Sequence, residues 1–463
     1  MKRAKKVNRS VDRDYLRTVP LRYKTVKGDR ALPVNRHICD LQLHCVITFA
    51  SQLDQVRLSK AVRLSMDAEP VLGCQLVENR WRQFWRRRED INKLEFCRVT
   101  KTDRPEKALI NYMVAPYDPY NDPMVQIHIF RAESDILCIK ANHIVSDAGG
   151  LKEYIRLLAF IYRNIGRDAA FKPQINLTGR RSYEQVTEFL HLSDKLKILR
   201  LSLWNWFDDL YPRKNWVFPF ILPQSTIDRT FLIRRISGDQ FRPVKQYAAH
   251  HGFTVNDILT ACLFRGLYKI LQPDFKTPLR LGVTINLRRY LPGRRGEAVT
   301  NLANLFLLNI GTHLGDTLEE TISFVHRQMT IHKQNYFGLH LTRKSIFRIQ
   351  WLPISLARGF HNFVLRLNRF LGSKAPPPWF TNMGLLDRKD MEFGELEITD
   401  AFMSAPVVYA PLLLIGATRF ANSLTITIGF CRTSYEEKKL SDLLDTVEKE
   451  METIPDLLHK QSP

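Results

Sequence analysis

Between residues 124 and 162, the pattern of apolar and polar positions predicts two strands followed by a helix. Apolar residues alternate with polar ones at 124–130, and a mostly apolar run follows at 135–141 after a short polar turn. The next apolar residues recur at helical spacing, at Leu151, Tyr154, Ile155, Leu158, Ile161 and Tyr162. Polar residues gather in the intervening loop, and a loop beyond a strand end can present side chains to a cleft while the scaffold holds them still.

The rest of the chain also alternates between expected strands and expected helices, which is typical of α/β and α+β proteins. Thr254 is a good start for one of the helices, because its side chain can cap free backbone N–H groups. The expected strands cover residues 38–50, 83–88, 94–100, 231–236, 279–287, 306–310, 407–415 and 424–430. The expected helices cover residues 53–66, 239–251, 254–271, 318–334 and 434–450.

Residues 166–225 show no clear period, and their prolines mark irregular connections: Pro173, Pro212, Pro219 and Pro223. We therefore expect a crossover between two α/β units in this part of the chain. The predicted division is an N-terminal lobe at 1–175, a crossover at 176–225 and a C-terminal lobe at 226–463.

Composition and charge indicate a folded protein that favours anionic partners. Of the 463 residues, 44% are hydrophobic and 25% charged, and 69 lysines and arginines against 47 acidic residues give a net charge of +22. No signal peptide or membrane-spanning apolar run is apparent, so we expect a cytoplasmic protein. The cysteines are scattered and include no CxxC pair, so we expect reduced core thiols and no disulfides or metal site at Cys39, Cys45, Cys74, Cys97, Cys138, Cys262 and Cys431.

Residues 142–150 read Asn-His-Ile-Val-Ser-Asp-Ala-Gly-Gly, and His143 is the candidate general base among them. Histidine has an unperturbed pKa of about 6.5, so it can remove a proton near neutral pH. Acyl transfer needs such a base, because a hydroxyl or amine attacks a carbonyl well only as its proton leaves. Gly149 and Gly150 allow a tight turn or the close approach of backbone to a ligand. A histidine four residues before an aspartate also occurs by chance, so the spacing alone leaves a purely structural role open.

The same segment resembles the HHxxxDG signature of the CoA-dependent acyltransferase superfamily, which includes chloramphenicol acetyltransferase, peptide-synthetase condensation domains, alcohol acetyltransferases and wax ester synthases. Weaker similarities follow in the same order over about residues 38–430, at 254–259, 283–288, 303–304 and 380–384. The sequence departs from the signature at Asn142, which replaces the first histidine, and at Ala148, which displaces the Asp-Gly step by one residue.

The resemblance implies an α/β (α+β) fold of two chloramphenicol-acetyltransferase-like lobes, each a mixed sheet flanked by helices, with an active-site tunnel between them. It implies that His143 is the general base and that Asp147 pairs with Arg288 to hold the loop. Backbone around Gly149 and Gly150 would position the thioester or its oxyanion. The remaining matches, Asn304 and Asn382, would support the site.

The reaction implied is transfer of an acyl group from a thioester to a small alcohol or amine, without a metal or a tightly bound cofactor. Acyl-CoA is the expected co-substrate, an acyl carrier protein is the alternative donor, and no residue is assigned to CoA binding. The two-lobed relatives are often monomers, and we expect the same for this chain.

Other functions fit parts of the sequence. A non-catalytic protein could bind a membrane peripherally through the basic and apolar stretch at 343–371, although a core helix pair explains that pattern equally well. Nucleic acid is not an expected partner, because the positive residues are dispersed and no nucleic-acid-binding motif is present. The run Arg86-Arg87-Arg88 is either a solvated face or a contact for the phosphates of CoA or an acidic carrier protein. A relative that keeps the fold and has lost activity is a further alternative.

Overall fold

The computed structural model describes residues 19–34, 36–79, 82–208, 215–222, 226–336, 338–339 and 375–459, together with 356, 359 and 363. Its strands are β1 (Arg22–Lys24), β2 (Gln42–Phe49), β3 (Cys74–Glu78), β4 (Gln83–Arg87), β5 (Cys97–Lys101), β6 (Val125–Arg131), β7 (Asp135–Asn142), β8 (Arg229–Ile236), β9 (Arg280–Asn286), β10 (Ala303–Asn309), β11 (Trp379–Leu386), β12 (Ile398–Ser404), β13 (Leu414–Phe420) and β14 (Ser423–Cys431). Its α-helices are α2 (Lys27–Val34), α3 (Gln55–Ala68), α4 (Pro105–Val114), α5 (Ala148–Arg167), α6 (Glu184–Thr187), α7 (Leu192–Asp208), α8 (Gly238–His250), α9 (Val255–Leu271), α10 (Leu318–Gln334), α13 (Glu437–Glu452) and α14 (Ile454–His459).

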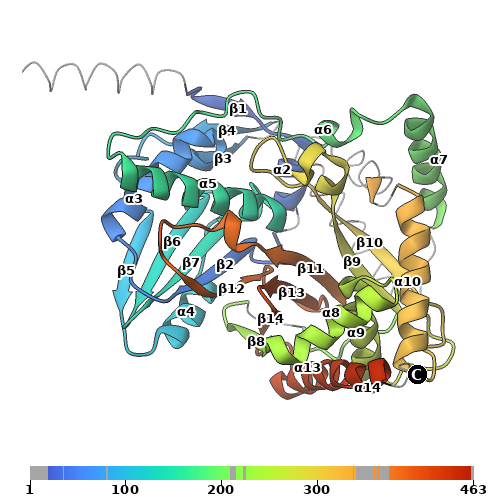
Figure 1. The fold of residues 1–463 in the computed structure, drawn as a ribbon. Helices are drawn as coiled ribbons and strands as arrows, with labels where there is room; N and C mark the ends of the chain where they lie inside the picture. The colour runs from blue at the N-terminus through green and yellow to red at the C-terminus, as the bar shows by residue number, and fades with distance from the viewer. Residues whose placement is uncertain are drawn as a thin grey trace, which may run out of the picture.

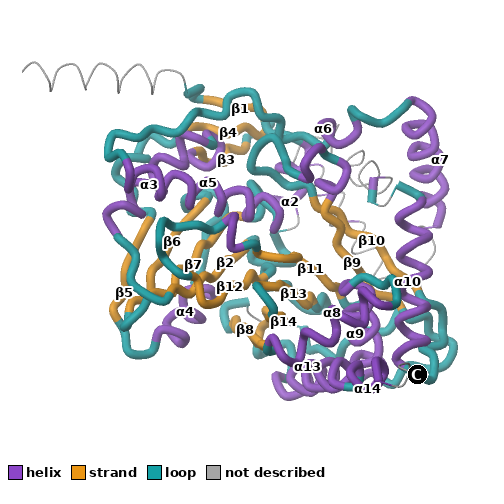
Figure 2. The backbone as a smooth tube through the Cα atoms, viewed as in Figure 1, coloured by secondary structure: helices purple, strands orange, loops and turns teal. Residues whose placement is uncertain are grey.

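Three β-sheets organise the described chain, and one of them combines strands from both halves of the sequence (Figures 1 and 2). The larger sheets have the strand orders β12-β2-β7-β6-β5 and β10-β9-β11-β13-β14-β8, and a small third sheet has the order β1-β4-β3. Strand β12 pairs antiparallel with β2, so that Ser404 lies opposite His44. The first lobe is therefore completed in space by a strand that belongs, in chain order, to the predicted C-terminal lobe.

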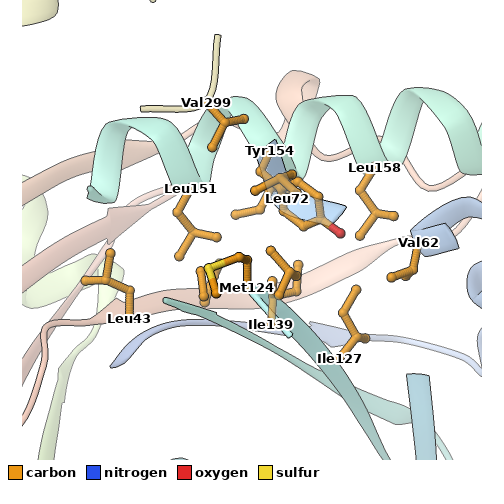
Figure 3. Packing of buried hydrophobic residues seen from close by; sticks show 14 of the residues in the cluster. Leu43, Val62, Leu72, Met124, Ile127, Ile139, Leu151, Tyr154, Leu158 and Val299 are labelled. Carbon is orange, nitrogen blue, oxygen red and sulfur yellow. The ribbon is translucent and has the colours of Figure 1, made fainter. Parts of the chain in front are cut away.

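Helices α3 and α5 pack against each other on one face of the five-stranded sheet and bury its core. In Figure 3, Leu151, Tyr154 and Leu158 of α5 point toward Ile127 and Ile139 on the strands below. Burial of one large apolar side chain contributes about 1.5–3 kcal/mol. This apolar stripe therefore fixes how α5 lies on the sheet, and with it the position of the loop that connects β7 to α5.

A second core lies between the six-stranded sheet and helices α8, α9, α10 and α13. Thr254 and Asp257 form a capping box at the start of α9, which confirms the helix start predicted at Thr254. Helix α4 covers the other face of the five-stranded sheet and also contacts β8 of the six-stranded sheet. A small apolar cluster that includes Leu109, Met113 and Phe231 fills this contact and joins the two sheets.

Most of the predicted strands and helices are confirmed with small shifts of their ends, and two expectations need correction. The strand predicted at 407–415 is wrong over most of its length, because β13 begins only at Leu414. Pro411 has no N–H to donate to a strand ladder and accounts for the break. The crossover expected to be irregular contains helix α7. The basic and apolar stretch at 343–371 lies outside the described residues, apart from 356, 359 and 363.

The seven cysteines are free thiols with buried side chains, as expected. Within the described ranges, no helix is both long enough and apolar enough to cross a bilayer.

Candidate active site

His143 lies directly beyond the end of β7, in a loop whose two ends are fixed by secondary structure. Strand β7 ends at Asn142 and helix α5 begins at Ala148. The His143 N–H donates to the carbonyl of Leu41 at 2.8 Å, which extends the pairing of β7 with the chain before β2. Leu41 has a φ of 57°, in the left-handed region that non-glycine residues rarely adopt. The carbonyl that binds His143 thus belongs to a residue in an uncommon backbone conformation, directly before β2.

The His143 ring has one nitrogen bound and one nitrogen open. Nδ1 lies 2.9 Å from the backbone carbonyl oxygen of Ser146. Because a carbonyl oxygen can only accept, Nδ1 carries the proton in the neutral ring and Nε2 keeps its lone pair. Nε2 has no hydrogen-bond partner among the described residues, and the side chain is partly exposed. The loop therefore selects the tautomer in which Nε2 can accept a proton.

Side chains from two distant segments hold the carbonyl groups of the loop. The amide nitrogen of Asn301 donates to the carbonyls of His143 and Ile144 at 3.0 and 2.9 Å. Arg181 Nη2 donates to the carbonyl of Val145 at 3.1 Å. Both acceptors of Asn301 are carbonyl oxygens, so its NH₂ group and not its oxygen must face the loop. The loop is consequently fastened at three successive residues.

Arg181 is itself fixed by a buried carboxylate. Its guanidinium nitrogens lie 2.7 and 2.9 Å from the two oxygens of Asp29, and its Nε donates to the carbonyl of Val299. Trp85 Nε1 donates to the same carboxylate at 2.7 Å. A bidentate guanidinium–carboxylate pair has a defined geometry, so Arg181 reaches Val145 from a rigid support.

Asp147 caps helix α5 and at the same time joins two other segments to the loop. Its Oδ1 accepts from the Gly150 N–H at 2.7 Å, and its Oδ2 accepts from the Leu302 N–H at 2.6 Å. Arg288 Nη1 lies 2.9 and 3.0 Å from the two carboxylate oxygens. The predicted pairing of Asp147 with Arg288 is therefore present, and each of the two side chains is only 3% exposed.

Arg288 is fully engaged by a second carboxylate and by a carbonyl. Its Nε and Nη2 lie 2.8 and 3.2 Å from the two oxygens of Glu153, and Nη2 also donates to the carbonyl of Thr300. Burial alone would lower the pKa of Arg288, but the charges of Asp147 and Glu153 raise it above its usual value. Arg288 lies in a short turn at Leu287–Tyr290, just beyond the end of β9.

The two glycines make room for protein groups. A Cβ on Gly149 would lie 2.5 Å from Arg288 Nη1, and one on Gly150 would lie 2.6 Å from the carbonyl oxygen of Thr300. The Gly150 N–H is already bound to Asp147. Gly150 thus serves close packing and helix capping, and the approach of this backbone to a thioester stays a prediction.

The remaining sequence matches have structural partners. Asn142 accepts the Ile144 N–H and donates to the carbonyl of Pro119. Asn304 donates to the carbonyl of Gly338 at 2.7 Å. Asn382 donates to the side chain of Asn256 and accepts the Gly384 N–H, where the pairing of β11 with β13 shifts register. These contacts join Asn142, Asn304 and Asn382 to segments that lie elsewhere in the chain.

A buried polar cluster, which includes Lys140 three residues before His143, lies on the face of the five-stranded sheet that α4 covers. Lys140 donates to the carbonyl of Tyr112 at 2.8 Å and lies over its ring, and burial lowers the Lys140 pKa to about 8. Asp40 faces Arg229 at 3.4 Å, and burial raises its pKa to about 6. His44 contacts Ser404, and burial lowers its pKa below the ordinary value. Ionisable side chains are thus buried inside the fold near the loop that carries His143.

Sequence reasoning missed Asn301, Arg181 and Glu153, although one of them had a local signal. Glu153 follows Gly149 by four residues and lies on the same side of α5, the side over which Arg288 lies. Asn301 and Arg181 contact the loop from 158 and 36 residues away, and nothing local marks them. Within the described ranges, no group of three or more His, Cys, Asp or Glu side chains is arranged to hold a metal ion.

The sequence matches no protein-family model and no curated protein, whereas its fold matches many solved structures. Polyketide synthase associated protein 5 from Mycobacterium tuberculosis is 14% identical with a TM-score of 0.65, over 94% of this chain and 98% of that chain. The trichothecene 15-O-acetyltransferase from Fusarium sporotrichioides is 13% identical with a TM-score of 0.66, over 94% and 95%. The first condensation domain of the calcium-dependent antibiotic synthetase is 14% identical with a TM-score of 0.68, over 94% and 97%.

Proposed function

Because the chain has the two-lobed fold of condensation domains and acetyltransferases, we propose that it transfers an acyl group from a thioester to a hydroxyl or amine. The observation that carries this proposal is the state of the His143 ring. Nδ1 is bound to the Ser146 carbonyl, so the basic nitrogen of this partly exposed residue is Nε2. Fold similarity alone supports many activities, and the site supplies the specific argument.

In the proposed reaction, Nε2 takes the proton of the acceptor as its oxygen or nitrogen forms a bond to the thioester carbonyl carbon. The tetrahedral intermediate then collapses, the carbon–sulfur bond breaks, and the leaving thiolate takes the proton back from Nε2. The products are an ester or amide and a free thiol, and His143 returns to its neutral form. Positioned proton transfer of this kind typically contributes about 10²–10⁴-fold in rate.

In this proposal, Asp147 and Arg288 hold the loop and do not exchange protons. The Asp147 carboxylate is bound by a guanidinium and by two backbone N–H groups, and these contacts fix the geometry of the loop. Asn304 supports the backbone at Gly338, and Asn382 joins β11 to the start of α9 through Asn256.

We propose acyl-CoA as the donor and an acyl carrier protein as the alternative. The acetyltransferase and the condensation domain are similar to this chain to the same degree, so the fold does not favour one donor over the other. The net charge of +22 suits both, since CoA carries phosphates and a carrier-protein partner would need an acidic surface.

The test measures thiol release with a panel of acyl-CoAs and acyl-pantetheine thioesters, each with alcohols and amines. We expect release by the wild type and a loss of at least about 100-fold in His143→Ala. His250→Ala, at the exposed end of α8, is the matched control and should retain full activity. A His143→Ala enzyme as active as the wild type would exclude this mechanism. A wild type that releases no thiol with any pair would favour a non-catalytic binding protein.

A further inference from the structure

The small sheet β1-β4-β3 has one buried face and one open face. Tyr23, Trp85 and Leu76 lie opposite one another on the inner face, where Trp85 is fully buried. Side chains alternate along a strand, so the neighbours of these residues lie on the outer face. The outer face therefore carries Arg22 and Lys24 of β1, Phe84 and Arg86 of β4, and Gln75 and Val77 of β3.

Among the described strand residues, the outer face is basic and carries no acidic side chain. Arg22, Lys24 and Arg86 are exposed, and none of them forms a salt bridge with any residue in the described part of the chain. The guanidinium of Arg22 lies 5.1 Å from the centre of the Phe84 ring. We call these four residues, Arg22, Lys24, Phe84 and Arg86, the basic sheet face.

The register places two of these cations directly opposite each other. Arg22 pairs with Arg86 in the antiparallel ladder of β1 and β4. Like charges at directly opposite positions destabilise a strand pair. The buried side of the same strands supplies the packing, so the fold itself does not require cations on the outside. An anionic partner would offset the repulsion.

The three arginines of the run Arg86-Arg87-Arg88 lie in different surroundings in the structure. Arg87 is on the inner face, buried against Asp67, and Arg88 pairs with Asp90 at 2.9 Å. Only Arg86 belongs to the basic sheet face. The unbalanced positive charge therefore arises from two strands that are far apart in sequence, and the run itself is mostly neutralised.

We propose that the basic sheet face docks on an anionic membrane surface. An open sheet face suits an extended surface better than a single small anion, for which a concave site is typical. Apolar groups accompany the cations: the Phe84 ring lies among them, and Leu21, directly before β1, is 74% exposed. Basic residues interleaved with apolar ones are the pattern of interfacial membrane contacts. In Figure 1 β1 lies near the upper edge of the molecule.

The experiment is co-sedimentation of the full chain with two kinds of vesicles, phosphatidylcholine alone and phosphatidylcholine with about one third phosphatidylglycerol. We expect binding to the second kind only, and release in about 1 M NaCl, where the screening length falls to about 3 Å. Arg22→Gln/Arg86→Gln should lower the partition coefficient by at least about tenfold, because each basic residue near an anionic surface contributes to binding.

The matched control is Arg98→Gln/Arg242→Gln, which removes the same charge at two exposed arginines on β5 and α8. It should bind the anionic vesicles like the wild type. Equal loss in both double variants would show that net charge alone drives binding and would overturn the proposal. Absence of vesicle binding by the wild type would overturn it as well. Membrane docking is independent of acyl transfer, and thiol release is not part of this test.

Discussion

Asp147 and Arg288 form a buried ion pair, with Nη1 at 2.9 Å from Oδ1, although 141 residues separate them in the chain. The carboxylate also caps α5 through Gly150 and accepts the Leu302 N–H. One side chain thus sets the start of the helix, the loop before it and the approach of the second half of the chain. The stability of this junction and the position of His143 should change together.

Asp147→Asn should reduce both stability and activity. The variant leaves Arg288 with one carboxylate fewer, and loss of one partner of a buried pair costs about 3–5 kcal/mol. We expect the free energy of unfolding to fall by about 3 kcal/mol in a denaturant titration, together with a loss of thiol release. Asp390→Asn is the control, because its carboxylate is 36% exposed and faces Arg156 at 3.5 Å. Its effect should stay below about 1 kcal/mol. An unaffected Asp147→Asn enzyme would disprove the clamp.

Asn301→Ala should affect turnover more than substrate binding. It removes the donors that hold the carbonyls of His143 and Ile144. Leaving two buried acceptors without partners costs about 1–3 kcal/mol each, and the loop can then relax away from its geometry. We expect kcat to fall at least about tenfold with little change in KM. Asn335→Ala removes an exposed hydrogen bond from a side-chain amide at the end of α10. It should change neither kcat nor KM. A rise in KM alone would assign Asn301 to substrate binding instead.

Gly150→Ala should be destabilising although alanine is the better helix former by about 1 kcal/mol. The added Cβ would meet the Thr300 carbonyl oxygen at 2.6 Å, and that backbone is held by Arg288. Overpacking of this kind costs about 1–3 kcal/mol. The melting temperature of the variant reports the result. Gly238→Ala at the start of α8 is the control, because its closest neighbour would be the Asn422 Cβ at 3.3 Å. Equal melting temperatures for wild type and Gly150→Ala would contradict the close approach.

Lys140→Met should change how stability depends on pH. Burial lowers the Lys140 pKa in the folded state to about 8, below its ordinary value of about 10.4. Below pH 8 both states are protonated. Between pH 8 and about 10 the unfolded state binds more protons, so the wild type gains stability relative to the variant, by up to about 3 kcal/mol. Cys138, Asp40, Arg229 and Tyr112 surround the ammonium group and remain in both proteins.

The measurement for Lys140→Met is the difference in unfolding free energy between variant and wild type from pH 7 to 10. Lys107→Met removes an exposed lysine on α4 and controls for the loss of one charge. A difference that is constant over the whole range would show that Lys140 is not desolvated in the folded protein.

The sequence predicts best where structure depends on neighbouring residues. The alternation in β6, the apolar run of β7, the apolar stripe of α5 and the capping start of α9 are local signals, and the structure has all four elements. Asp147 at the end of the loop was predicted to pair with Arg288, and that pair is present.

The sequence predicts least where partners are distant. Strand β12 has ordinary local composition, and nothing in it indicates pairing with β2 in the other lobe. Asn301 and Arg181 hold the His143 loop through single side chains from other segments. No local sequence pattern therefore predicts these contacts. For Gly149 and Gly150 the sequence leaves open a tight turn or close approach to a ligand, and it does not indicate that Arg288 and the backbone at Thr300 pack directly against them.

The pairing of β12 with β2 has a consequence for synthesis of the chain. Residues 398–404 leave the ribosome long after β2, β7 and β6 have been made. Until then, β2 is an unpaired edge of the five-stranded sheet. Unpaired edges of this kind are templates for association with other chains. The lobes are therefore not separable modules, and a fragment that ends before residue 398 would expose the edge that the complete chain covers.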